Sequence, residues 1–165
     1  MKEIWYLLIC PEGDEANYVE KCQELINPIG LKEIICFQYH RMMRYGGKWH
    51  LEKRTALPGY IFLSGTNAMV LRQKMQRNNW MKLDVSLIPC ETPYLKDMCK
   101  EGYLVGMSKG IIRKGVLIVT SGPLEGREEI IRKVDRHKRT AEIEIPFPGK
   151  RKCLTVGLEI YEKEI

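Results

Sequence analysis

Residues 114–126 read KGVLIVTSGPLEG and follow a change in the pattern of the chain near Gly102. Closely spaced glycines, including Gly106 and Gly110, precede them, which is typical of a linker or a domain edge. Beyond these glycines the pattern predicts strands only, the first over 116–120. We therefore expect a linker over 105–112 between two domains of different kinds.

The segment after this linker predicts a small all-β domain. Further strands are expected at 128–134, 140–145 and 154–161, and in the last two the apolar and polar residues alternate. Such alternation buries one face of a strand and leaves the other in water. Short strands joined by tight turns favour a barrel over 113–165, because closing a sheet removes its exposed edges.

The segment before the linker mixes strands and helices. We expect strands over 4–10, 31–39, 60–63 and 81–88, and helices over 15–26, 67–75 and 91–102. Asp14 can cap the first helix, whose apolar residues form one stripe. Residues 40–54 are polar and basic, as in a loop or an extended hairpin. The order predicts an α+β domain over 1–104, an antiparallel sheet with packed helices.

The composition indicates an ordinary soluble protein. Of 165 residues, 44% are hydrophobic and 29% charged, and the net charge is +6. The six cysteines form no C-x-x-C pair, and the apolar run at 4–10 is short for a signal peptide. We expect a reduced, cytoplasmic, monomeric protein with free thiols and no membrane segment.

No pattern points to catalysis. The three histidines lie in polar or basic segments without a metal-ligand spacing, and Gly46-Gly47-Lys48 lacks the first glycine and the hydroxyl residue of a phosphate-binding loop. We therefore expect no enzyme, no metal and no cofactor.

Positive charge gathers in the last third of the chain. Residues 1–107 carry 14 Lys and Arg against 12 Asp and Glu, and residues 108–165 carry 13 against 9, so the net charges are +2 and +4. Basic clusters lie at 113–114, 132–139 and 150–152. Charged hairpin ends also keep β-proteins soluble. Three clusters on one small domain favour binding to the phosphates of a nucleic acid.

Two segments resemble a known family. LPGYIF at 57–62 and WYLL at 5–8 are similar to F-P-G-Y-V-F and W-Y-V-V in the N-terminal (NGN) domain of NusG transcription factors. KGV…SGPLEG at 114–126, followed by Val134-Asp135, resembles the KOW motif of the NusG C-terminal barrel, and Phe147 with Gly149-Lys150-Arg151 resembles its F-G-R. The resemblance covers essentially the whole chain in the same order.

The resemblance implies a grip on the clamp helices of RNA polymerase through an exposed apolar patch of the NGN domain. The matching positions are Leu57, Pro58, Gly59 and Tyr60. Leu57 stands where the family has a larger Phe. A partly exposed aromatic ring beside a turn can fill a pocket on a partner.

The basic C-terminal segment is similar to the LoaP-type NusG paralogues, which implies antitermination through an RNA hairpin of a nascent leader transcript. An A-form stem is recognised mainly by shape, through phosphates and 2′-hydroxyls. The candidate RNA-binding residues are Lys114, Arg127, Arg132, Lys133, Arg136, His137, Lys138, Arg139, Lys150, Arg151 and Lys152.

Two alternatives remain open. A general NusG elongation factor would use its KOW domain to bind protein partners such as ribosomal protein S10 or Rho, and the basic loops would then only aid solubility. A ribosomal or other RNA-structural protein can also carry a KOW module.

Overall fold

The computed structural model describes residues 4–26, 31–65, 73 and 86–164. The chain forms two compact units, and each is made of two separate stretches of sequence. The first unit comprises Met1–Cys36 and Leu57–Pro93, and the second comprises Phe37–Ala56 and Tyr94–Ile165.

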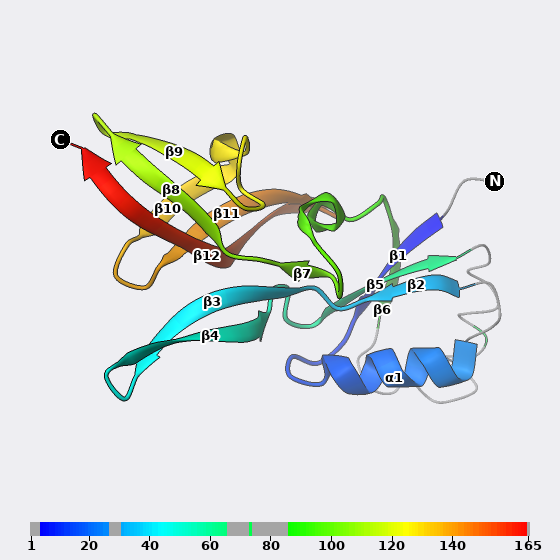
Figure 1. The fold of residues 1–165 in the computed structure, drawn as a ribbon. Coiled ribbons are helices and arrows are strands. Elements are labelled where there is room, and N and C mark those ends of the chain that lie inside the picture. Colours follow the sequence, from blue (N-terminus) through cyan, green and yellow to red (C-terminus); the bar gives the residue numbers. More distant parts are fainter. Residues whose placement is uncertain (1–3, 27–30, 66–72, 74–85, 165) are drawn as a thin grey trace. The chain divides into compact units, whose positions relative to one another are not determined.

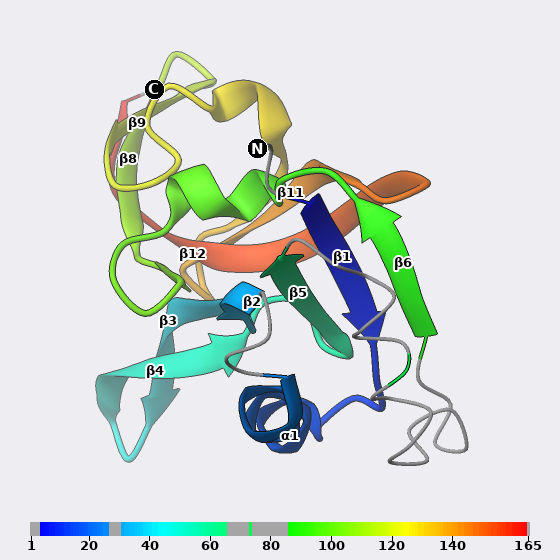
Figure 2. The same ribbon diagram turned by 90° about the vertical axis from the view of Figure 1, so that its right-hand side faces the viewer.

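In the described part of the first unit, a four-stranded sheet packs against the helix α1 (Glu15–Ile26; Figures 1 and 2). Its elements are β1 (Ile4–Ile9), α1 (Glu15–Ile26), β2 (Leu31–Ile35), β5 (Tyr60–Gly65) and β6 (Ser86–Cys90). The strand order is β2-β5-β1-β6, and β1 pairs antiparallel with both of its neighbours. Tyr18 and Cys22 of α1 are buried in one cluster with Tyr6 and Leu8 of β1 and Ile61 of β5, so the apolar stripe of the helix covers the sheet.

A buried carboxylate fastens the start of α1 to the turn before β5. Glu15 is 5% exposed, and its Oε1 and Oε2 accept hydrogen bonds from the backbone N–H groups of Gly13 (2.9 Å) and Gly59 (2.8 Å) respectively. Gly59 has φ +84°, and a Cβ there would lie 3.0 Å from the carbonyl oxygen of Cys10. A glycine is therefore required at this turn for both conformation and space.

The second unit contains a five-stranded and a three-stranded sheet. Its elements are β3 (Gln38–Tyr45), β4 (Lys48–Thr55), the 3-10 helix η2 (Tyr94–Met98), β7 (Leu104–Val105), β8 (Ser108–Arg113), β9 (Val116–Ser121), the 3-10 helix η3 (Glu128–Ile130), β10 (Ile131–Asp135), β11 (Thr140–Phe147) and β12 (Lys150–Glu164). The strand orders are β10-β11-β12-β8-β9 and β4-β3-β7. The long strand β12 joins the two halves of the larger sheet. Its residues 150–157 pair with β11, and its residues 158–164 pair with β8.

The alternation in β11 and β12 sets the core of the larger sheet. Ala141, Ile143 and Ile145 are at most 2% exposed, whereas Glu142 is exposed and Glu144 half-buried. The apolar residues of β12 are likewise buried through Leu158. The alternating pattern therefore predicted the two faces of β11 and most of β12, but Gly157 of the polar set is buried and Ile160 of the apolar set is only half-buried.

The expected fold class is wrong. We expected an α+β domain with an antiparallel sheet and packed helices, followed by a separate all-β barrel. The described residues instead form three sheets and one α-helix, and the unit with the five-stranded sheet also includes residues 37–56. The helix expected over 91–102 is reduced to η2, because Pro93 and Gly102 leave too short a run to offset helix nucleation.

Other elements differ in detail from the expectations. The strand expected over 31–39 is two strands, and the basic segment after it is the β3–β4 hairpin. Residues 108–112 of the expected linker belong to β8. The helix expected over 67–75 lies outside the described residues, apart from residue 73. The domain limits of 1–104 and 113–165 stay a prediction.

All six cysteines are free thiols, and burial raises the pKa of Cys22 to about 12. Within the described part of the chain, no helix is long and apolar enough to cross a membrane. The same residues contain no group of three or more His, Cys, Asp or Glu side chains that could hold a metal ion.

We predict that Glu15→Ala destabilises the protein by about 1–3 kcal/mol, because it leaves two N–H groups without their acceptor. Glu20→Ala, at an exposed position of the same helix, should change the free energy of unfolding by less than about 0.5 kcal/mol. Urea denaturation followed by circular dichroism measures both. Equal stabilities of the two variants would contradict a fastening role for Glu15.

Candidate nucleic-acid interface

The turn between β10 and β11, residues 136–139, presents three basic side chains to solvent. Asp135 Oδ1 accepts a hydrogen bond from the backbone N–H of Lys138 at 3.0 Å, and this bond lowers the pKa of Asp135. Arg139 closes the turn with φ +54°. Arg136, His137 and Lys138 are exposed, so a fixed backbone carries them outward as a group. We call residues 136–139 the basic turn.

Two other candidate cations already have a carboxylate partner. Arg132 Nη2 and Arg151 Nε lie 3.1 and 3.2 Å from the same oxygen, Glu144 Oε2. Hydrogen bonds from Arg132 and then Arg151 lower the pKa of Glu144. Exposed ion pairs of this kind add little stability. A phosphate could compete for both arginines, but they are not free cations.

Arg127 and Arg139 contact aromatic rings within the second unit. The guanidinium carbon of Arg139 lies 4.0 Å from the centre of the Trp49 ring, and its Nη1 lies 3.4 Å from Glu159 Oε1. Arg127 Nη1 donates a hydrogen bond of 3.3 Å to the hydroxyl of Tyr94. Both arginines are half-buried, so the structure gives them packing roles that the sequence did not indicate.

Three further candidates lie elsewhere in the second unit. Lys150 and Lys152, in the first residues of β12, each place Nζ 5.9 Å from the centre of the Phe147 ring. Lys114 is exposed on the turn between β8 and β9 and has φ +52°. The eleven candidates therefore do not form one patch of equivalent cations.

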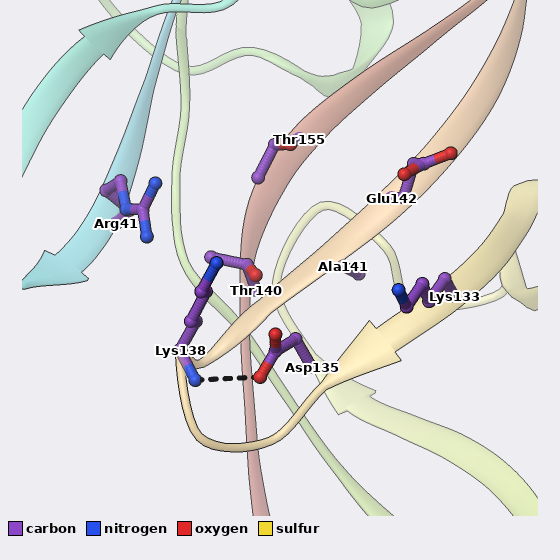
Figure 3. A pocket seen from close by; sticks show the side chains of 8 residues that line it. All are labelled: Arg41, Lys133, Asp135, Lys138, Thr140, Ala141, Glu142 and Thr155. Carbon is purple, nitrogen blue, oxygen red and sulfur yellow. Dashed lines mark hydrogen bonds between the residues drawn. The ribbon is translucent and has the colours of Figure 1, made fainter.

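A pocket of about 210 Å³ opens beside the basic turn (Figure 3). Two of the candidates, Lys133 and Lys138, contribute to it, and so does Arg41 from β3, which we did not predict. The full lining is Arg41, Lys133, Asp135, Lys138, Thr140, Ala141, Glu142 and Thr155. The sequence indicates the basic character of the β3–β4 hairpin, but it does not indicate that this hairpin lies beside the five-stranded sheet.

Two contacts place the β3–β4 hairpin against the five-stranded sheet. A Cβ at Gly157 of β12 would lie only 2.5 Å from the carbonyl oxygen of His40, so the backbone of β3 passes β12 at very close range. The ring of Trp49 on β4 lies under Arg139 at the end of the basic turn. The hairpin thereby becomes part of the same surface as the basic turn.

The predicted polymerase-binding segment is only partly accessible. Leu57 is 2% exposed and belongs to the core, and Gly59 is buried and bonded to Glu15. Pro58 is exposed, and Tyr60 is half-buried at the start of β5. An apolar contact at this turn would therefore involve Pro58 and Tyr60 rather than Leu57.

No protein-family model matches the sequence, and no curated protein matches it significantly. Among solved structures, NusG of Thermotoga maritima, described in work on domain interaction in that protein, is similar to this chain. The sequences are 14% identical over 95% of this chain and 94% of that chain, with a TM-score of 0.45. A similarity at this level assigns neither a family nor a function.

We predict that Arg132→Gln raises the pKa of Glu144 toward its ordinary value, because it removes the strongest of the hydrogen bonds that lower it. Carboxyl-carbon NMR titration measures this pKa. Arg113→Gln breaks a different ion pair, with Glu164, and should leave the pKa of Glu144 unchanged. An unshifted pKa in Arg132→Gln would contradict the pairing.

The sign of the pH dependence follows from the direction of the shift. Folding lowers the pKa of Glu144, so its contribution to stability is present above the pKa of the unfolded chain. That contribution is lost as the pH falls through the pKa of the folded protein.

Proposed function

We propose that the protein is a NusG-like transcription antitermination factor that binds RNA polymerase and an RNA hairpin of a nascent leader transcript. The observation that carries the RNA part is the basic turn. The side chains of Arg136, His137 and Lys138 are exposed, and within the described residues they make no hydrogen bond or salt bridge. The cations Arg136 and Lys138 can therefore bind phosphates without first losing a salt bridge.

The structural positions of the KOW-like residues support the proposal. Gly122 has φ +95°, and a Cβ there would lie 2.5 Å from Cα of Ser108. Leu124 is fully buried, and its N–H donates to the hydroxyl of Ser108 at 3.0 Å. Gly122 and Leu124 of the KOW-like segment therefore allow the β9–β10 connection to pack closely on β8. This packing supports the sheet that carries the basic turn.

The two proposed contacts would act together. An A-form stem offers rows of phosphates that projecting cations can reach without reading base edges. A factor held on polymerase through its first unit would meet the emerging RNA at a high effective concentration. A modest RNA affinity would then be enough to restrict action to transcripts that carry the hairpin.

We predict that Arg136→Gln combined with Lys138→Gln weakens binding to an RNA stem-loop about tenfold at low salt. The negative slope of log K against log salt should become less steep by roughly 1–2. Fluorescence anisotropy over a series of salt concentrations measures both effects. The physical reason is that fewer counterions are released when fewer phosphates are neutralised.

The matched control is Lys109→Gln with Lys163→Gln. Both residues are exposed on β8 and β12, and the change removes the same charge outside the basic turn. An equal loss of RNA affinity in the two double variants would show that the effect comes from net charge alone. Unchanged binding by the first variant would defeat the RNA part of the proposal.

For the polymerase part, we predict that Tyr60→Ala lowers the affinity for core RNA polymerase at least about tenfold, as for an aromatic anchor in an interface. Retention of purified polymerase on the immobilised full chain gives the measurement, and thermal melts confirm folding. Tyr45→Ala removes a 53% exposed ring from the second unit and serves as the control. A wild-type chain that retains no polymerase at low salt would overturn this part.

A general elongation factor with a protein partner is the second candidate. The observation in its favour is an exposed apolar group on β9 and β12. Val116, Ile118 and Tyr161 are 61%, 40% and 55% exposed, and the Tyr161 hydroxyl is 3.1 Å from the hydroxyl of Thr120. Parallel titrations with ribosomal protein S10, Rho and an RNA stem-loop separate the two candidates. Binding to a protein partner with no RNA binding would favour the second.

A further inference from the structure

The pocket beside the basic turn contains an arginine with unsatisfied hydrogen-bonding capacity. Nε of Arg41 has almost no accessible surface and no hydrogen-bond partner in the described structure. An arginine carries five N–H donors and keeps its charge at any ordinary pH. Nε itself is enclosed by the protein, so a ligand from outside could reach only the terminal Nη donors of this guanidinium.

The other polar groups of the pocket come from neighbouring strands. Lys133 of β10, Glu142 of β11 and Thr155 of β12 are consecutive partners across the sheet, so their side chains form one row. Thr140 belongs to the adjacent row, and Lys138 projects from the basic turn. Figure 3 shows Arg41 on its own strand, facing this group from β3.

The charges of the pocket suit a single negative charge. Arg41, Lys133 and Lys138 supply three positive charges, and their side chains make no salt bridge with the described residues. Asp135 and Glu142 supply two negative charges. The surplus is one positive charge, which equals in magnitude the charge of one phosphodiester group.

The chemistry of the lining favours a phosphate over a base. No aromatic ring lines the pocket, so a base would find no surface on which to stack. A guanidinium can donate two parallel hydrogen bonds to two phosphate oxygens, and two ammonium groups and two threonine hydroxyls are further donors.

We propose that Arg41 of the β3–β4 hairpin, with Lys133 and Lys138 of the larger sheet, binds one phosphodiester group of RNA. The hydroxyls of Thr140 and Thr155 donate to the same group. The RNA-binding surface is therefore composed of two segments about a hundred residues apart in sequence, held together where β3 passes Gly157. This proposal rests on the RNA binding proposed above and assigns it a specific subsite.

The test compares full-length variants in binding a fluorescein-labelled RNA stem-loop with an uninterrupted A-form stem. Arg41→Gln should weaken binding about tenfold at low salt. The negative slope of log K against log salt should become less steep by roughly 1, the change expected when one phosphate contact is lost. Arg41→Lys keeps the charge but not the planar donor pair, so its affinity should fall between those of Arg41→Gln and the wild type.

The matched control is Arg44→Gln, which removes the same group from an exposed position of the same strand that does not line the pocket. It should change binding no more than about twofold, as expected for a loss of net charge alone. Circular dichroism melts establish that all variants are folded. Equal losses in Arg41→Gln and Arg44→Gln, with a wild type that binds, would overturn the subsite and leave the proposed function standing.

A wild type that binds no RNA stem-loop would instead overturn the proposed RNA function, and the subsite with it. A second arm tests a free anion by thermal shift with inorganic phosphate at constant ionic strength. Stabilisation of the wild type that is lost in Arg41→Gln, together with unchanged RNA binding by that variant, would assign the pocket to free phosphate and contradict the RNA proposal.

Discussion

The close approach of the β3 backbone to Gly157 is the constraint on which the candidate site depends. With any side chain at this position of β12, the carbonyl group of His40 and the side chain of Met107 would have to move. The missing Cβ allows a hairpin from the first third of the chain to lie on a sheet built from the last third. Stacking of Arg139 on Trp49 holds the hairpin at a second point.

The basic residues of the second unit fall into groups with different physical roles. Some are engaged in ion pairs, as Arg132 and Arg151 are with Glu144, and others support rings, as Arg127 supports Tyr94. Only the cations without such partners are ready to meet a phosphate at no cost in broken contacts. A count of lysines and arginines cannot separate these groups, because the difference lies in which carboxylates and rings the fold brings to each cation.

The periodicity of apolar residues predicts those helices and strands that bury only one face. The helix over 15–26 and the buried faces of β11 and β12 follow from periodicity alone. The closely spaced Gly106 and Gly110 predict a linker over 105–112, where the structure has most of β8. Gly110 is needed within that strand, since a Cβ there would lie 2.7 Å from the carbonyl oxygen of Ile118. This requirement is imposed by the neighbouring strand, so it cannot be predicted from the sequence pattern around Gly110. The burial of Leu57 has the same character, because a Pro-Gly turn alone suggests exposure.

The sequence by itself determined the inner and outer faces of the main strands, the positions of the tight turns and the basic character of two hairpins. Each of these depends on neighbours within a few residues, where side-chain alternation and glycine content act directly. Only the tertiary structure decided that Arg41 faces Lys133 and Lys138, and which arginines are already paired. Those relations depend on the pairing of strands distant in the chain, whose register is set by packing over the whole sheet and not by any local pattern.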